Sequence, residues 1–158
     1  MADVRLRPLR EDEWEGFVEH SKRGYVESMV THGGVAPDFA REKAERDFAS
    51  LFSDGLATKG QYVFAVEDVE TGEAVGRVWF ARRQIDGEER AFLYDIDLDE
   101  RVRGQGLGRR AMQLLEDEVR TQGLRRIALN VFGGNEVARG LYRSLGYAES
   151  AVWMTKEL

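Results

Sequence analysis

Arg103-Gly104-Gln105-Gly106-Leu107-Gly108 is the stretch of this 158-residue chain that says most about its fold. It lies between an apolar, strand-like run at residues 91–98 and a helix-like run at residues 111–119. A glycine-rich turn from a strand into a helix presents backbone N–H groups and the positive end of the helix dipole to whatever lies above it. The stretch therefore predicts an anion site, most often one for phosphate, at the start of a helix.

The spacing of the glycines excludes two common kinds of phosphate-binding turn. A dinucleotide fingerprint requires Gly-x-Gly-x-x-Gly, but counting from Gly104 places Arg109 at the third glycine position. A nucleoside-triphosphate loop requires Gly-Lys-Ser/Thr, whereas Gly108 is followed by two arginines. The turn therefore matches neither of these two motifs.

Length and composition indicate one ordinary globular domain covering residues 1–158. Hydrophobic residues make up 42% of the chain and charged residues 33%. The net charge of −6 argues against nucleic acid as a partner and favours a cationic or amine-bearing substrate. Because no cysteine is present, disulfides, thiolate nucleophiles and cysteine-ligated zinc are excluded.

The remaining composition argues against metal and membrane binding. His20 and His32 are the only histidines, so there is little material for a histidine-based metal site or a Ser-His-Asp triad, and we expect both to be solvated surface residues. The first residues lack the apolar core of a signal peptide, and no run approaches the roughly 20 apolar residues of a membrane span. We expect a cytoplasmic protein with no bound metal.

Hydrophobic periodicity predicts mostly helix in the first third of the chain and mostly strand after Gly60. Turn sequences at residues 70–73 and 86–87 join three strands into a predicted antiparallel meander. The fold class is α+β, with a mixed, mostly antiparallel central sheet flanked by helices. The expected strands are 4–7, 62–66, 75–81, 92–98, 126–132 and 148–154, and the expected helices lie within 11–30, at 37–53, from the glycine turn to about 122, and at 136–145.

Two motifs in the second half of the chain carry a resemblance to a known family. The first is Arg-x-x-Gly-x-Gly, formed by Arg103, Gly106 and Gly108. The second places Asn135 seven residues before Tyr142, which belongs to a Leu-Tyr-x-x-x-Gly run. Asn135 is also the last residue of a Val-Phe-Gly-x-Asn pattern. Across residues 92–147 the chain resembles the GNAT superfamily of N-acetyltransferases. The Val-Phe-Gly-x-Asn pattern resembles that of a bacterial branch of this superfamily. The resemblance implies transfer of an acetyl group from acetyl-CoA to a primary amine.

The resemblance also implies which residues hold acetyl-CoA. Main-chain N–H groups of the glycine turn would approach the pyrophosphate, where any Cβ would intrude. In the family, the strand before the turn splays from the next strand, and the N–H of Leu98 would donate to the thioester oxygen. Asn135 would contact the coenzyme and cap its helix. The implied coenzyme-binding residues are Ile96, Leu98, Arg103, Gly104, Gln105, Gly106, Leu107, Gly108, Asn135 and Tyr142.

For catalysis, the resemblance implies Tyr142 as the general acid that protonates the departing thiolate. The glutamate that many family members use as a base is missing, because Tyr94 and Asn130 stand at the two usual positions. Asp95 and Asp97 share one face of the predicted strand, where carboxylates are costly unless they are paired. We predict Asp97, nearest the turn, as the base or as a group that relays the proton through water.

Other functions remain open from the sequence alone. A coenzyme-A-binding sensor or partner-binding domain without turnover would keep the same motifs, and a nucleotide-phosphate enzyme could use the same turn. Within the enzyme hypothesis, the amine acceptor could be a small molecule, such as a polyamine, antibiotic or amino acid, or a protein amine. Resembling proteins are commonly dimers, so a homodimer is a further expectation.

Overall fold

The computed structural model describes residues 3–158, which form a five-stranded sheet with helices on both faces. The strand order is β1-β2-β3-β4-β5; the first four strands are antiparallel and β5 runs parallel to β4. Short 3₁₀ turns occur at Glu11–Glu13, Gly55–Ala57 and Glu100–Val102. The elements are β1 (Val4–Pro8), α1 (Trp14–Thr31), α2 (Pro37–Leu51), β2 (Gln61–Asp68), β3 (Ala74–Ile85), β4 (Glu88–Leu98), α3 (Leu107–Thr121), β5 (Ile127–Leu129) and α4 (Glu136–Ser144).

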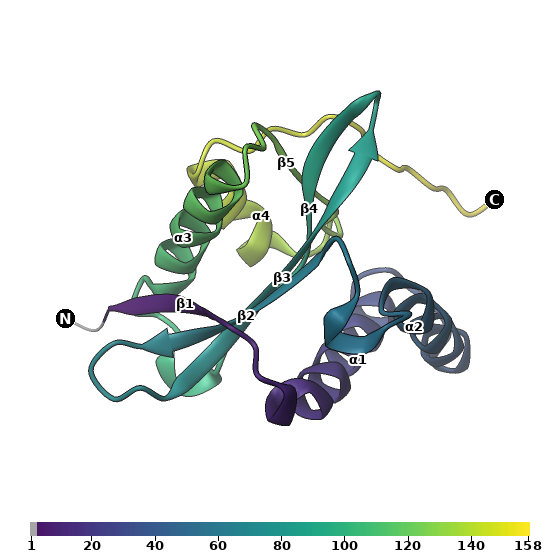
Figure 1. The fold of residues 1–158 in the computed structure, drawn as a ribbon. Helices are drawn as coiled ribbons and strands as arrows, with labels where there is room; N and C mark the ends of the chain where they lie inside the picture. The colour runs from purple at the N-terminus through teal and green to yellow at the C-terminus, as the bar shows by residue number, and fades with distance from the viewer. Residues whose placement is uncertain (1–2) are drawn as a thin grey trace.

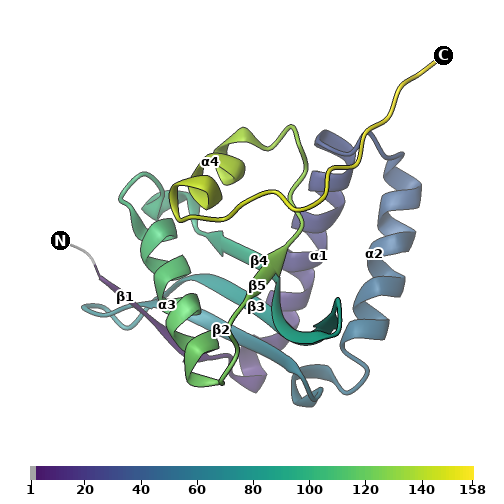
Figure 2. The ribbon, with the colours of Figure 1, turned by 90° about the horizontal axis from the view of Figure 1, so that it is seen from above.

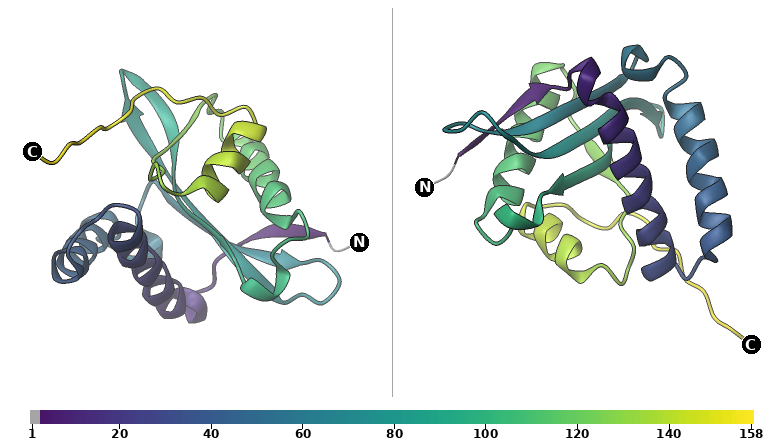
Figure 3. Two further views of the ribbon diagram at one scale, coloured as in Figure 1. Left: turned by 180° about the vertical axis from the view of Figure 1, so that it is seen from behind. Right: turned by 90° about the horizontal axis from the view of Figure 1, so that it is seen from below.

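The sheet separates two helical layers (Figure 1). Helices α1 and α2 cover one face, and α3 and α4 cover the other, as the views from above, behind and below confirm (Figures 2 and 3). The larger core lies between the sheet and α3, where Phe80, Met112 and Leu115 are fully buried. A cluster of aromatic side chains, including Phe48 and Trp79, packs the other face against α1 and α2. Both faces of the sheet are therefore covered, as the predicted fold class requires.

A bulge and an opening in the sheet change the course of β4. The β3–β4 register shifts between Trp79 and Phe80, which leaves Tyr94 as the extra residue in β4. Strand β5 pairs with β4 only from Ala91 to Leu93. Beyond Leu93, none of residues 3–158 pairs with β4 on that side, so its last residues leave an open strand edge facing α3 and α4. This opening is the splay that the family resemblance implies.

Gly76 holds the end of β4 close to β3, where it pairs with Leu98. A Cβ at Gly76 would meet the Cδ2 atom of Leu98 at 2.6 Å and crowd the carbonyl oxygen of Asp97. We expect Gly76→Ala to lower the free energy of unfolding by about 1–3 kcal/mol, because the added methyl forces the two strands apart. Urea unfolding measures this loss, and an unchanged midpoint would contradict such close contact between the strands.

The predicted last strand at residues 148–154 is wrong. That segment has no regular structure and extends from the body of the protein, with Trp153 92% and Met154 87% exposed (Figure 2). A strand needs a partner edge, and β5, reduced to three residues against the seven predicted, ends at Leu129 and offers little edge for pairing. The apolar run alone could not reveal this. The meander β2-β3-β4 is confirmed.

None of the helices described in residues 3–158 combines the length and apolar character that a membrane crossing requires.

Candidate active site

The glycine turn opens helix α3 with two residues in the left-handed backbone region. Gly104 has φ +79° and Gly106, the N-cap, has φ +77°, a conformation that costs other residues about 1–2 kcal/mol. Leu107 begins the helix and buries its side chain in the core, which anchors the turn and leaves the main chain to face outward. The N–H groups of this first helical turn have no partner within the helix, and such groups are suited to bind an anion.

The open edge of β4 presents main-chain groups beside the glycine turn. The N–H of Asp99 donates to the Val75 carbonyl of β3, and backbone groups of an antiparallel strand alternate in direction. The N–H groups of Ile96 and Leu98 therefore point away from β3, toward the side that β5 leaves open. The side chain of Leu98 is buried in the core, so only its main chain is available to a ligand.

Arg103 joins the turn to this edge. Its Nε donates to the Leu98 carbonyl at 2.9 Å, and its Nη2 lies 3.1 Å from Oδ1 of Asp97. The guanidinium thus points back onto the end of β4. Its charge stays beside the turn while its hydrogen bonds fix the turn against the strand.

Asp95 and Asp97 lie on the face of β4 that is covered by α1, as their alternation predicted. Arg77 of β3 bridges them, with Nε 3.3 Å from Asp95 and Nη2 2.6 Å from Asp97. Helix α1 supplies the other contacts: the Ser21 hydroxyl donates to Asp95, and Nε2 of His20 lies 3.0 Å from Oδ2 of Asp97. The carboxylate pair is therefore held by β3 and α1, and Asp97 also by Arg103 of the glycine turn.

Two groups near the opening have shifted pKa values. Burial raises the pKa of the Asp95 carboxyl, a shift that its Ser21 hydrogen bond and the Arg77 charge only partly oppose. Burial also raises the pKa of the Tyr142 phenol, and the negative charge of Asp95 adds to this. The phenol keeps its proton at neutral pH.

The raised pKa of Asp95 makes its contribution to stability depend on pH. A carboxyl whose pKa is higher in the folded state favours folding most fully below its unfolded pKa, and this contribution is lost as pH rises through the folded pKa. Asn at this position does not ionise and still accepts from Ser21. We expect the urea midpoint of Asp95→Asn to increase relative to that of the wild type as pH rises from about 3 to 8, because only the wild type loses stability by ionisation at this position. A difference between the two midpoints that stays constant with pH would contradict the raised pKa of Asp95.

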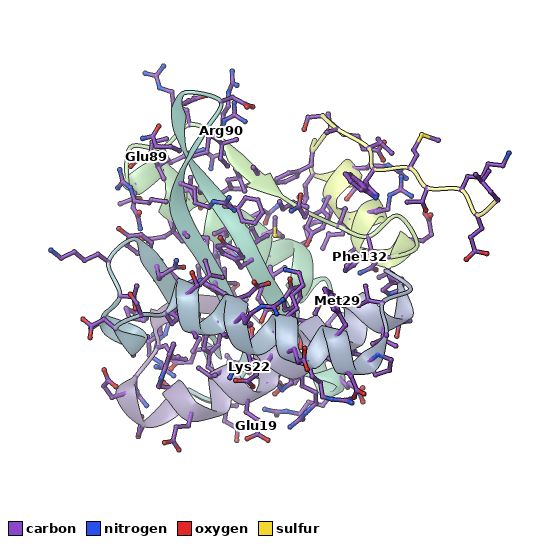
Figure 4. The ribbon with its side chains drawn as sticks, turned by 90° about the vertical axis from the view of Figure 1, so that its right-hand side faces the viewer. Glu19, Lys22, Met29, Glu89, Arg90 and Phe132 are labelled. Atoms are coloured by element: carbon purple, nitrogen blue, oxygen red, sulfur yellow. The ribbon has the colours of Figure 1, made fainter. Side chains whose placement is uncertain are left out.

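Asn135 stands at the start of α4, where its side chain accepts a hydrogen bond from the Ala138 N–H at 3.2 Å. The cap uses the amide oxygen and leaves the amide NH₂ for a ligand. Asn130 is exposed after β5. The loop between β5 and α4 reaches across to α1, where Phe132 packs against the cluster of Met29 (Figure 4). The loop closes the far end of the opening.

The sequence did not predict the contributions of His20, Ser21 and Arg77. The prediction of His20 as a surface residue is confirmed, because its side chain is 47% exposed, but its ring also contacts Asp97. These residues lie 18 to 77 positions from the carboxylates they touch. A lone histidine on a charged helix gives no local signal for such a contact.

Comparisons with known proteins agree with this geometry. The model of the acetyltransferase (GNAT) family matches residues 6–147. The chain is 31% identical over 153 residues to the uncharacterised N-acetyltransferase YdgE of Bacillus subtilis, covering 97% of each. It is similar to the solved structure of YycN, an acetyltransferase from Bacillus subtilis, with a TM-score of 0.91, 29% identity and 99% coverage of both chains. An acetyltransferase from Pyrococcus furiosus shares the fold at a TM-score of 0.67 and 24% identity, over 100% of both chains.

The fold and the site therefore define an acyltransferase. The chain belongs to the GNAT family of acetyltransferases.

Proposed function

We propose that the protein transfers an acetyl group from acetyl-CoA to a primary amine, by direct attack of the amine on the thioester. The observation that carries the proposal is the open edge of β4 beside the glycine turn, with Tyr142 packed against the core cluster that contains Leu98 and Leu107. Acetyl-CoA has a pyrophosphate at one end and a thioester at the other. An anion site followed by an unpaired strand edge suits both parts.

The residues present fit this coenzyme. Residues 104–108 would bind the pyrophosphate through main-chain N–H groups, with Arg103 adding charge beside them. Ile96 and Leu98 would pair with the pantetheine arm as a strand would. Asn135, at the start of α4, would donate from its free amide NH₂ to the coenzyme. The coenzyme supplies an activated acetyl group with a thiol as its leaving group.

The chemistry can be written for this chain's residues. The ammonium form of the acceptor first loses one proton to a base, and the freed lone pair forms the C–N bond as the carbonyl π electrons move to oxygen. The Leu98 N–H donates to that oxygen and stabilises the developing negative charge. As the C=O bond re-forms, the C–S bond breaks and Tyr142 gives its proton to the departing sulfur. The second proton on nitrogen returns to the Tyr142 oxygen, directly or through water.

Asp97 is the proposed acidic group on the amine side of this reaction. It lies one residue before Leu98, and its side chain is on the face of β4 that α1 covers. Its contact with His20 offers a route for the proton. Since the chain has no cysteine, no thiol-bound acetyl enzyme can form.

Two measurements test the proposal. Acetyl-CoA should raise the melting temperature of the protein, whereas ATP and NAD should not. Release of free thiol should follow addition of at least one member of a panel of polyamines, aminoglycosides, amino acids and peptides. Protection by ATP or NAD in place of acetyl-CoA would favour a nucleotide enzyme. If acetyl-CoA raises the melting temperature but no amine causes thiol release, the protein is better described as a coenzyme-A-binding sensor without turnover.

A further inference from the structure

We propose that His20, oriented by Asp97, is the group that accepts the proton of the amine acceptor. This inference rests on the proposed function, and it assigns to α1 a catalytic residue that the family motifs do not contain. The geometry that carries it is the contact between the His20 ring and the Asp97 carboxylate, 3.0 Å from Nε2 to Oδ2.

The oxygens of Asp97 are already engaged by two cations. Arg77 donates to Oδ2 at 2.6 Å and Arg103 to Oδ1 at 3.1 Å. A proton taken up by this carboxylate would remove the negative charge on which both charge-assisted hydrogen bonds depend. Asp97 is therefore better suited to hold a neighbouring base in place than to accept the proton itself.

His20 has the chemistry and the access that a base requires. With a proton on Nε2, the ring donates to Asp97 and leaves the lone pair of Nδ1 free, as in a carboxylate-oriented histidine base. Nδ1 has no hydrogen-bond partner among residues 3–158, and the side chain is 47% exposed.

The position of His20 also fits the reaction. Asp97 precedes Leu98, whose N–H faces the open edge proposed for the thioester, and the next residue of α1, Ser21, binds Asp95. The ring thus lies on the α1 side of β4, at the end of the strand where the reacting groups meet. An amine that enters from this side passes the ring before it reaches the thioester.

The proton balance is simple. The ammonium form of the acceptor gives one proton to Nδ1 of His20, which becomes an imidazolium paired with Asp97, and the freed lone pair attacks the thioester. The imidazolium then releases its proton to water. The charged group in contact with the ring is Asp97 of β4, and Arg77 of β3 and Arg103 contact that same carboxylate. On α1, the adjacent Glu19 pairs with Arg23.

The test is His20→Gln, with Glu19→Gln as the matched control on the same helix. The glutamine amide can still donate to Asp97 but cannot accept a proton. We expect kcat at neutral pH to fall about 10- to 100-fold, with an unchanged KM for acetyl-CoA. The loss should shrink as pH approaches the pKa of the amine, because free amine then needs no base. Glu19→Gln should keep the wild-type rate and pH profile.

A second variant guards against a structural cause. His20→Ala should lose a similar factor in rate and regain part of it on addition of free imidazole. Equal rates for wild type and His20→Gln would overturn the inference and leave the proposed function standing. A loss that is the same at every pH, without imidazole rescue, would also overturn it. If the wild type binds acetyl-CoA but acetylates no amine, both the proposed function and the inference fail.

Discussion

Tyr142→Phe is expected to lower kcat by about 10²- to 10³-fold while KM for acetyl-CoA changes little. The phenol is the proposed donor of the proton to the departing sulfur, and phenylalanine keeps the ring but removes the O–H. Burial and the charge of Asp95 raise the phenol pKa above its ordinary value of 10. The acid form therefore persists across the physiological pH range. A thiol-release assay at saturating amine measures the effect.

Tyr147→Phe is the matched control for this variant. Its ring packs beside that of Tyr142, with centroids 5.8 Å apart, but its hydroxyl lies 3.3 Å from Glu116 on α3. Removing that hydroxyl should leave kcat within about twofold of wild type, because it donates to no reacting atom. If kcat fell equally in the two variants, Tyr142 would have a packing role and would not be the proton donor. Since the pKa of Tyr142 is raised, the wild type should retain this acid to a higher pH than an ordinary phenol would allow.

Local sequence signals predicted the parts of the fold that depend on neighbours in the chain. Alternating side chains and the turns at residues 70–73 and 86–87 predicted the meander, since hairpin strands pair with the next strand along the chain. The glycine turn and the spacing of Asn135 and Tyr142 predicted their helix starts in the same way. Each signal is complete within about ten residues.

The features that sequence could not predict depend on distant partners. The bulge at Tyr94 and the short β5 arise from how β4 fits between two neighbours, and the loss of the strand at 148–154 follows from the edge that β5 lacks. The contact of His20 with Asp97 spans 77 positions. Such contacts exist only after helix and sheet have packed, so the carboxylates could be predicted as functional while their partners could not.

Gly108→Ala is expected to stabilise the protein and weaken its binding of acetyl-CoA at the same time. Gly108 is the second residue of α3, where alanine in place of glycine favours the helix by about 0.5–1 kcal/mol. In the absence of ligand the added Cβ makes only ordinary contacts, 3.8 Å from Leu141 and 3.9 Å from Leu98. Those two residues flank the opening between α4 and β4, so the methyl group would enter the space proposed for the coenzyme.

The loss of affinity should be large because the pyrophosphate would be held off the N–H groups of the turn. Two charge-assisted hydrogen bonds at about 1.5–3 kcal/mol each correspond to a Kd increase of at least about a hundredfold. Calorimetric titration with acetyl-CoA and urea unfolding without it measure the two effects separately. Gly16→Ala on α1, whose Cβ would meet nothing within 4 Å, should gain similar stability with an unchanged Kd. Undiminished affinity in Gly108→Ala would mean that the coenzyme does not approach the start of α3.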